Sequence, residues 1–308
     1  MSAVMVEIDA FEGVRRDEPM RRHTSWRVGG PADFYFEPES EDALARFLAA
    51  LPENVPVHVV GLGSNLLVRD GGVRGAVIST RKVGKRLERL DETRVKAGAG
   101  VPCATLARQC VRWSLGPAAF FAGIPGTVGG ALAMNAGAFG GETWDRVESV
   151  ETIDRRGVRR VRTADDYEIG YRHVALKNRA DGDLPEFFLS GTFRFEHDES
   201  ASMTSIREML DRRAATQPLG VPSCGSVFRN PEGTHAGALI ERAGLKGFSI
   251  GGAKVSEKHA NFIVNTGGAT AEDIERLIET VRRRVAERFG VELELEARII
   301  GEHRWEAG

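Results

Sequence analysis

The sequence predicts an α+β protein that folds in two parts. Its 308 residues are more than one typical domain needs and too few for three. Hydrophobic residues make up 42% of the chain and charged residues 28%, which is ordinary for a globular protein with a substantial core. A polar segment, 197–202, separates a block rich in short strands from a block of mixed helix and strand. We therefore expect one domain over 1–198, with its core at about 21–197, and a second over 199–308.

The elements of the first half are predicted from apolar periodicity. Residues 40–51 form a helix, because apolar residues recur at helical spacing after Ser40, a favourable cap. A second helix is predicted over 102–115, with Cys103 and Cys110 on one buried face. Short strands and one hairpin-type turn surround these helices: strands at 57–60, 66–68, 77–79 and 94–97, and the turn at 69–72.

The second half contains a longer hairpin and the clearest helix. Strands at 147–153 and 158–161 flank a turn at 156–157. The strand predicted over 187–195 alternates, with one face made of Phe187, Leu189, Phe193 and Phe195. A helix is predicted over 204–214, and another begins at Thr270, where Asp273 completes a capping box, and ends at Gly290. A final alternating strand follows over 291–300.

The charge pattern excludes several classes of protein. The formal net charge is -2 and the arginines are scattered, so neither nucleic acid nor a membrane is expected as a partner. The three cysteines form no CxxC motif, which favours reduced thiols and a cytoplasmic protein, and no signal peptide is expected. The long uncharged stretch 113–141 is broken by glycines and by Pro117 and Pro125, so we interpret it as interior loop and short helix.

Three glycine clusters are the strongest functional signal. They are 28–32 (VGGPA), 61–65 (GLGSN) and 123–130 (GIPGTVGG), the last continuing through Asn135, Gly137 and Gly140. Glycine lets the backbone adopt positive φ and brings N–H groups close to an anion. These segments therefore suit a phosphate-bearing cofactor, and a short helix beginning near Gly130 would turn its N-terminus towards the phosphate. The alternative is that the glycines only form tight turns.

A dinucleotide site of the Rossmann type is the main competing interpretation of the second cluster. Gly61 and Gly63 follow a predicted strand, as that fingerprint requires, but Leu66 stands where its third glycine belongs. The chain then enters the turn at 69–72 and not a long helix. Because the third glycine and the long helix are both missing, we reject a Rossmann site.

Three polar residues stand in segments that suit chemistry. Arg172 lies in an irregular stretch where a guanidinium would hold a carboxylate or an enolate, the alternative being an ordinary surface arginine. Ser226 lies in a turn rich in glycine and proline, without the second glycine of a nucleophile elbow. Glu296 shares a predicted strand face with Glu292 and Glu294, which is typical of a solvated face, but its place near the apolar end would raise its pKa by burial. The seven histidines form no HExxH motif or close His/Cys cluster, so no metal is expected.

In their order, these segments resemble the UDP-N-acetylenolpyruvoylglucosamine reductase family. The matching segments are 23–32 (HTSWRVGGPA), 61–68 (GLGSNLLV), 123–140, 170–172 (GYR), 225–231 (GSVFRNP) and 295–301 (LEARIIG). The resemblance extends from about Arg21 to Gly301, and six motifs in the same order make coincidence a poor explanation.

The resemblance implies an FAD-binding domain of the vanillyl-alcohol-oxidase (PCMH) type over 1–198 and a substrate-binding domain over 199–308. It further implies non-covalent FAD, NADPH as hydride donor, and reduction of UDP-N-acetylglucosamine enolpyruvate to UDP-N-acetylmuramate for peptidoglycan synthesis. By resemblance, Arg172 and Glu296 stabilise an enolate, Ser226 donates a proton to carbon, and Tyr171 and Asn230 contact the substrate. The implied cofactor contacts are Gly61, Gly63, Ser64, Asn65, Leu66, Gly123, Ile124, Pro125, Gly126, Gly129, Gly130, Asn135 and Gly137.

Two other functions stay open at this point. One is a non-catalytic flavin- or nucleotide-binding module, and the other is a hydroxy-acid or sugar oxidase on the same flavin fold. The presence of Arg172, Ser226 and Glu296 together favours the reductase. One branch of the family has an extra loop with a tyrosine that closes over the substrate. Only a block of strands and one helix separate Arg172 from Ser226 in this sequence, so the chain resembles the branch without that loop. Ala297 also stands where the family more often has valine. We expect a monomer that acts on small molecules.

Overall fold

The computed structural model describes residue 8 and residues 11–177 and 185–304. The chain divides into two compact units: Met1–Arg15, Phe34–Gly61 and Ala76–Arg212 form the first, and Arg16–Asp33, Leu62–Gly75 and Arg213–Gly308 form the second. It passes between them in the loop between Gly61 and Leu62 and within β1 (Val14–Pro19), β2 (Pro31–Phe36), β5 (Val73–Ser79) and α5 (Met203–Thr216). The last passage therefore lies inside a helix, because 203–216 is continuously helical, and the functional assignment of 1–198 and 199–308 stays a prediction.

The first unit contains one hydrophobic cluster around α2 (Glu41–Ala50). Ser40 caps this helix as predicted, its hydroxyl accepting from the Ala43 N–H at 3.1 Å. Phe47 and Leu48 are buried with residues of β5 and with Ile153. β3 (Val57–Val60) runs parallel to β5, in a sheet with the strand order β1–β2–β5–β3. Strand β3 has the bounds that the sequence predicted.

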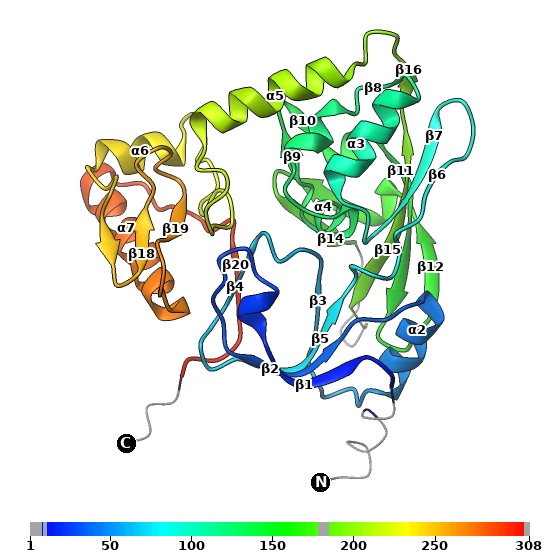
Figure 1. Ribbon diagram of the computed structural model, residues 1–308, viewed down its shortest axis with the longest axis horizontal. Coiled ribbons are helices and arrows are strands. Elements are labelled where there is room, and N and C mark those ends of the chain that lie inside the picture. The colour runs from blue at the N-terminus through cyan, green and yellow to red at the C-terminus, as the bar shows by residue number, and fades with distance from the viewer. Residues whose placement is uncertain (1–7, 9–10, 178–184, 305–308) are drawn as a thin grey trace. The chain divides into compact units, whose positions relative to one another are not determined.

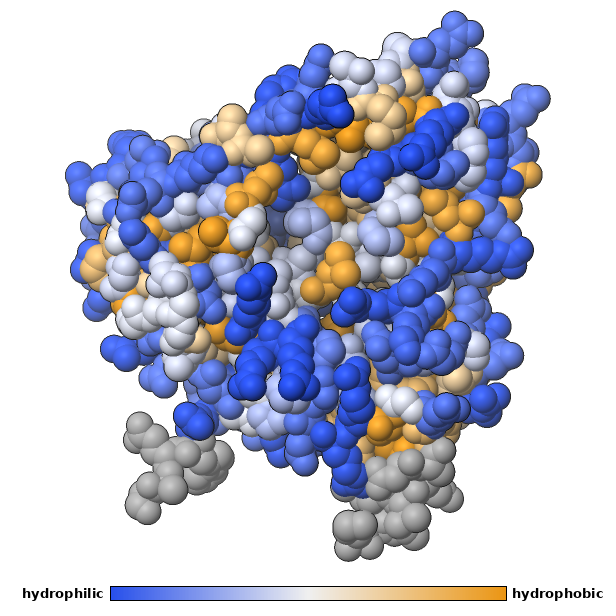
Figure 2. Space-filling view, viewed as in Figure 1, coloured by the Kyte–Doolittle hydropathy of each residue, from blue (hydrophilic) through white to orange (hydrophobic). Residues whose placement is uncertain are grey.

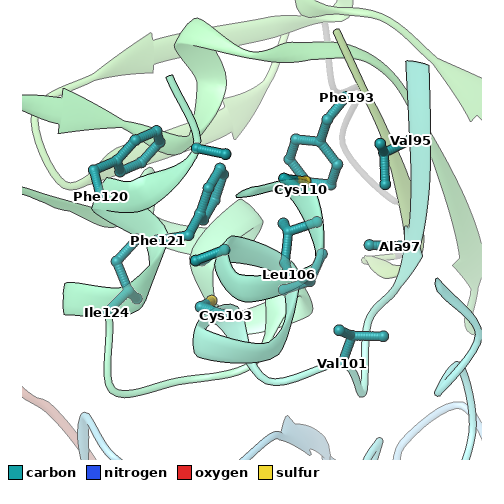
Figure 3. Close-up of a cluster of buried hydrophobic side chains, with 14 of the residues drawn as sticks. Val95, Ala97, Val101, Cys103, Leu106, Cys110, Phe120, Phe121, Ile124 and Phe193 are labelled. Carbon is teal, nitrogen blue, oxygen red and sulfur yellow. The ribbon is translucent and has the colours of Figure 1, made fainter. Parts of the chain in front are cut away.

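A five-stranded antiparallel sheet with the order β12–β11–β15–β7–β6 is the largest sheet of the first unit. Its strands are β6 (Leu87–Arg89), β7 (Arg94–Gly98), β11 (Val147–Asp154), β12 (Arg159–Arg162) and β15 (Glu186–Arg194). Helices α3 (Cys103–Arg112) and α4 (Val128–Met134) pack on one face of it (Figure 1). Cys103 and Cys110 lie in the hydrophobic cluster between α3 and the sheet, which confirms the predicted buried helix face (Figure 3).

The single face predicted for the strand over 187–195 is wrong. Phe187 and Leu189 pack in the cluster around α2, whereas Phe193 and Phe195 pack beneath α3 and α4. The register between β11 and β15 shifts after Glu151, so an extra residue reverses the two faces of the strand. A β-bulge of this kind leaves no trace in simple alternation.

Short elements complete the first unit. Two small hairpins carry the segments of functional interest: β9 (Gly137–Ala138) pairs with β10 (Gly141–Glu142), and β13 (Tyr167–Gly170) pairs with β14 (His173–Leu176). The others are β8 (Leu115–Gly116), β16 (Glu196–His197) and the 3-10 turns η2 (Ala119–Gly123), η3 (Thr143–Asp145) and η4 (Ala164–Asp166).

The second unit packs two helices against a small sheet. Helices α6 (Ala236–Arg242) and α7 (Ala271–Phe289) lie beside β17 (Ser249–Ile250), β18 (Ala253–Val255) and β19 (Ile263–Asn265) (Figure 1). The predicted capping box is confirmed, because Thr270 accepts from the Asp273 N–H at 3.0 Å. Gly290 ends α7 with φ +67, as predicted. The 3-10 turn η1 (Met20–Arg22) also belongs here.

Two predictions about the second unit are wrong. Only β20 (Arg298–Ile300) forms the strand expected over 291–300, with a single bridge from Leu295 to Phe228 before it. The turn at 69–72 does not join a hairpin, because β4 (Leu66–Val68) pairs in parallel with β20. Both differences arise from pairing partners that lie far away in the sequence.

The surface of the described residues is mixed in character. On the face in view in Figure 2, hydrophobic residues lie interspersed among hydrophilic ones. Within the ranges that the structure describes, no helix has the length and hydropathy of a membrane span. Across the same ranges, no group of three His, Cys, Asp or Glu side chains has the arrangement of a metal site.

Candidate functional site

Several glycines of the third cluster are required by close packing within the first unit. A Cβ atom on Gly123, at the end of η2, would lie 2.7 Å from the Ala138 Cβ and 2.5 Å from the Phe139 ring. A Cβ atom on Gly129 would lie 2.8 Å from the Ala99 Cβ. For these two positions, tight packing of the chain on itself is a sufficient reason for glycine.

Gly130 has a different environment. It is exposed on α4, and among the described residues, apart from the backbone of the helix itself, an added Cβ would approach only the Thr127 Oγ1 within 4 Å, at 3.8 Å. On Gly61, which follows β3, a Cβ would lie 2.4 Å from the same Oγ1. Glycines of the second and third clusters therefore meet at one hydroxyl group.

The Thr127 hydroxyl has no hydrogen-bond partner among the residues that the structure describes, although only 1% of this residue is exposed. Buried hydroxyl groups are nearly always hydrogen-bonded, so an orphan calls for an explanation. A bound group with acceptor oxygens, such as a pyrophosphate, would supply the partner. The residues present thus fit a phosphate-bearing cofactor. Thr127 was not among the predicted site residues, although its place between Gly126 and Val128 was a usable signal.

The predicted helix near Gly130 begins two residues earlier than expected, at Val128. Its first N–H groups are used within the protein: Val128 donates to the Val101 carbonyl at 2.8 Å and Gly129 to the Ala99 carbonyl at 2.9 Å. The prediction that this helix N-terminus faces a phosphate is therefore wrong for these two donors, because the chain after β7 already accepts from them.

Arg172 lies at the tip of the β13–β14 hairpin, in left-handed backbone with φ +54. Its Nη1 donates to the Asn135 carbonyl and its Nη2 to the Gly137 carbonyl, both at 3.2 Å. The guanidinium also lies 4.8 Å from the centre of the Tyr171 ring, which belongs to a residue that is 44% exposed. Such backbone costs an arginine about 1–2 kcal/mol, and strain of this kind concentrates at functional sites.

Asn135 connects the third glycine cluster to this hairpin. It is 2% exposed and ends α4 in left-handed backbone. Its Nδ2 donates to the Glu142 Oε2 at 2.8 Å and to the Gly170 carbonyl at 3.1 Å, and its Oδ1 accepts from the Trp144 N–H at 3.0 Å. Both amide hydrogens thus serve the protein, as does the backbone N–H, which donates to the Ala131 carbonyl, so the predicted cofactor contact of Asn135 would fall to its oxygen atoms as acceptors.

Gly63 of the glycine loop 61–65 is fixed in the second unit by the N-terminal motif. Gly63 has φ +63, and a Cβ there would lie 1.9 Å from the His23 carbonyl oxygen, so only glycine fits. The Ser25 N–H donates to the Gly63 carbonyl at 3.1 Å. The cluster at 28–32 is packed equally closely, because a Cβ on Gly30 would lie 2.3 Å from the Asp70 carbonyl oxygen.

Three sequence-predicted segments meet in the second unit. The Asn65 Nδ2 donates to the Glu296 carbonyl at 2.9 Å, and the Arg298 N–H donates to the Asn65 carbonyl at 3.0 Å. The Glu296 N–H donates to the Val227 carbonyl at 2.8 Å, next to Ser226. The structure thereby brings Asn65 of the glycine loop, the serine segment and the glutamate segment together.

Buried residues flank Ser226 in the serine segment: Cys224, Val227 and Phe228. The Asn261 amide binds both the N–H and the carbonyl of Phe228, at 3.0 and 2.8 Å, in the manner of a strand neighbour. Burial, and then the charge of Glu296, raise the pKa of the Cys224 thiol well above its ordinary value. Glu296 is half-buried, whereas Glu294 is exposed. Asn261 is a positioning residue that sequence analysis missed, because its partner is 33 residues away.

The other predicted residues are placed as follows. Asn230 is exposed and its Oδ1 accepts from the Ala236 N–H at 3.1 Å, at the start of α6. Leu66 is buried in β4, whereas Ser64 is half-buried in the loop before it, and Pro125 is exposed beside buried Ile124. Arg172 and Tyr171 belong to the first unit, and Ser226, Asn230 and Glu296 to the second.

A polar cavity of about 380 Å³ lies elsewhere in the first unit and contains no predicted site residue. The four basic side chains that line it are each paired with an acidic one: Arg86 with Glu88, Lys96 with Glu151, Arg159 with Glu41 and Arg160 with Asp154. Its charges are thus already neutralised within the protein.

Comparison with known proteins identifies both parts of the chain. A profile described as an FAD binding domain matches residues 32–162, and one described as the C-terminal domain of UDP-N-acetylenolpyruvoylglucosamine reductase matches residues 217–300. The chain is 54% identical to the UDP-N-acetylenolpyruvoylglucosamine reductase of Alkalilimnicola ehrlichii, covering 94% of this chain and 95% of that protein. It is 53% identical to the protein of that name from Nitrosospira multiformis, covering 98% and 93%.

A solved structure gives the same result. The crystal structure of the reductase from Thermus caldophilus superposes with a TM-score of 0.76 at 33% identity, covering 93% of this chain and 98% of that one. The predicted fold class, α+β with an FAD-binding domain followed by a C-terminal domain, is confirmed by these matches.

Proposed function

The chain belongs to the UDP-N-acetylenolpyruvoylglucosamine reductase family, and on that premise we propose that it reduces UDP-N-acetylglucosamine enolpyruvate to UDP-N-acetylmuramate. This reaction serves peptidoglycan precursor synthesis, with FAD as the cofactor and NADPH as the hydride donor. The observation that carries the proposal is the meeting of Asn65, the Ser226 segment and Glu296 in the second unit. A flavin loop, a proton donor and an acid are what this chemistry requires.

Residues of both glycine loops would hold the FAD. In the first unit these are Gly61, Thr127 and Gly130: the orphan hydroxyl offers a hydrogen bond, Gly61 lies against that hydroxyl, and Gly130 leaves room. In the second unit they are Gly63, Ser64 and Asn65. When bound, FAD supplies the transfer of hydride from NADPH to the enolpyruvyl group.

The catalytic side chains act on the charge that develops in the substrate. As hydride arrives at the terminal carbon, negative charge moves into the substrate carboxylate. The Arg172 guanidinium would hold that carboxylate, and Glu296 would stabilise the same enolate as a hydrogen-bonding acid. The Ser226 hydroxyl then donates its proton to the other carbon. Serine is a weak acid, so this step depends on close placement, which the backbone contacts beside Ser226 favour.

Four finer points belong to the proposal. The protein is cytoplasmic and acts as a monomer, and its partners are small molecules only. Tyr171 and Asn230 contact the substrate. Of the alternatives, an oxidase would not need the Ser226 segment, and a binding module would not need Arg172 and Glu296.

The test begins with the purified protein, which we expect to be yellow. It should oxidise NADPH over repeated turnovers only when UDP-N-acetylglucosamine enolpyruvate is supplied, with one UDP-N-acetylmuramate formed for each NADPH consumed. Oxygen consumption with sugars or hydroxy acids would identify an oxidase, and flavin binding without turnover would identify a binding module. A colourless protein that takes up no flavin would refute the proposal.

A further inference from the structure

We propose that Glu142 is a positioning residue that acts on Arg172, through a network that we call the brace. The brace consists of Asn135, the Gly137 carbonyl and Glu142, all in the first unit. The role of Arg172 at the substrate rests on the proposed function, but the brace itself rests on contacts within the chain.

The contacts of the brace converge on one guanidinium group. The Glu142 Oε1 lies 3.8 Å from the Arg172 Nη1, while the Glu142 Oε2 accepts from the Asn135 Nδ2 at 2.8 Å. The Asn135 carbonyl in turn accepts from the same Arg172 Nη1 at 3.2 Å. One carboxylate therefore supports Arg172 twice, by its charge and through the asparagine.

The backbone fixes the geometry of the carboxylate itself. Glu142 pairs with Gly137 in the β9–β10 hairpin, and the Gly137 carbonyl accepts from the Arg172 Nη2 at 3.2 Å. The Asn135 Nδ2 also donates to the Gly170 carbonyl, at the base of the hairpin tip that carries Arg172. Two separate hairpins are thus joined through the three residues Asn135, Glu142 and Arg172.

Partial burial strengthens the electrostatic interaction between Arg172 and Glu142. The side chains of Arg172 and Glu142 are 15% and 34% exposed, so water screens them less than a surface pair. Arg172 is held in left-handed backbone at φ +54, a conformation that persists only where surrounding contacts impose it. A carboxylate that fixes the guanidinium supplies such a contact.

The test separates the two half-reactions of the flavin-loaded full chain. We expect Glu142→Ala to leave bleaching of the flavin by NADPH unchanged. Reoxidation by UDP-N-acetylglucosamine enolpyruvate should slow by about 10- to 100-fold, the loss that a misplacement of about 1 Å near reacting atoms causes. Glu142→Gln keeps an acceptor for Asn135 and should lose less. In an Arg172→Lys background, Glu142→Ala should cause no further loss.

A second readout does not depend on turnover. Hydrogen exchange across 167–176 in the flavin-loaded chain should become faster in Glu142→Ala, because the hairpin loses its support. The matched control is Glu148→Gln, which removes a carboxylate paired with Arg94 and Arg194 in β7 and β15. It should change neither readout.

The outcomes distinguish the brace from the proposed function. Unchanged exchange together with unchanged reoxidation in Glu142→Ala would overturn the brace. Unchanged reoxidation with faster exchange would also overturn the proposal, by showing that Glu142 supports the hairpin without positioning Arg172 for the reaction. If the wild-type flavin is not reoxidised by the substrate at all, the proposed function fails and the positioning role fails with it, and the exchange result then shows only whether Glu142 supports the hairpin.

Discussion

The Gly130→Ala variant tests a glycine of the third cluster that close packing does not explain. Gly130 lies exposed in α4, and outside the helix backbone an added methyl group would meet, among the described residues, only the Thr127 Oγ1, at 3.8 Å. Replacing a helical glycine by alanine stabilises a folded protein by about 0.5–1 kcal/mol. We therefore expect the apoprotein to unfold at a slightly higher denaturant concentration than the wild type.

Flavin binding should change in the opposite direction. If a phosphate group lies against Gly130, a methyl group displaces it and weakens about one charge-assisted hydrogen bond, which corresponds to about 1.5–3 kcal/mol. The dissociation constant of FAD should then rise by about 10- to 150-fold. Gly129→Ala is the matched control, because its Cβ would lie 2.8 Å from the Ala99 Cβ, and overpacking there should lower stability by up to about 2 kcal/mol.

The assay combines urea unfolding of the apoproteins with titration of FAD followed by flavin fluorescence. Gly130→Ala should have raised stability and lowered affinity, and Gly129→Ala should have lowered stability. A Gly130→Ala variant that binds FAD as tightly as the wild type would refute the reasoning, because the open face of α4 would then not face the cofactor.

Three further predictions concern single side chains. Thr127→Val removes the orphan hydroxyl, so apoprotein stability should be kept while FAD affinity falls by about 0.5–1.5 kcal/mol; equal affinity in the same titration would argue against the phosphate contact. Ser226→Ala should let NADPH bleach the flavin but block reoxidation by the enolpyruvyl substrate, and unchanged steady-state turnover would exclude Ser226 as proton donor. Burial raises the pKa of the Cys103 and Cys110 thiols to about 12, so neither should react with a thiol reagent at neutral pH until the protein unfolds. Because the unfolded thiols lose protons from about pH 8.5 upwards while the folded ones keep theirs, the free energy of unfolding should fall as pH rises through that range, and a flat profile would contradict the shift.

Local signals predicted the four longer helices well, whereas the short helix α6 was not predicted. The Ser40 cap and the Thr270–Asp273 capping box lie within a few residues of the helices that they begin, so their physics is contained in a short window. The buried face with Cys103 and Cys110 follows from helical spacing alone.

Structural features that depend on contacts between residues far apart in the sequence were not predicted. The strand expected over 291–300 shrinks to β20 because its partner is β4, more than two hundred residues earlier in the chain. The first N–H groups of α4 are taken by the chain after β7, which periodicity does not reveal. Thr127 was not predicted because its contact with Gly61 joins two segments that lie far apart in the sequence. Glycine composition indicated where a cofactor belongs, and tertiary contacts decide which glycines serve it.

The most direct test of the proposed reaction is an anaerobic experiment on the wild-type holoprotein. NADPH is added until the yellow colour is bleached, excess NADPH is removed, and UDP-N-acetylglucosamine enolpyruvate is then mixed in while the flavin absorbance is followed. We expect the colour to return in proportion to the substrate added, with UDP-N-acetylmuramate as the product. A flavin that stays bleached in the presence of excess substrate would contradict the proposed reaction.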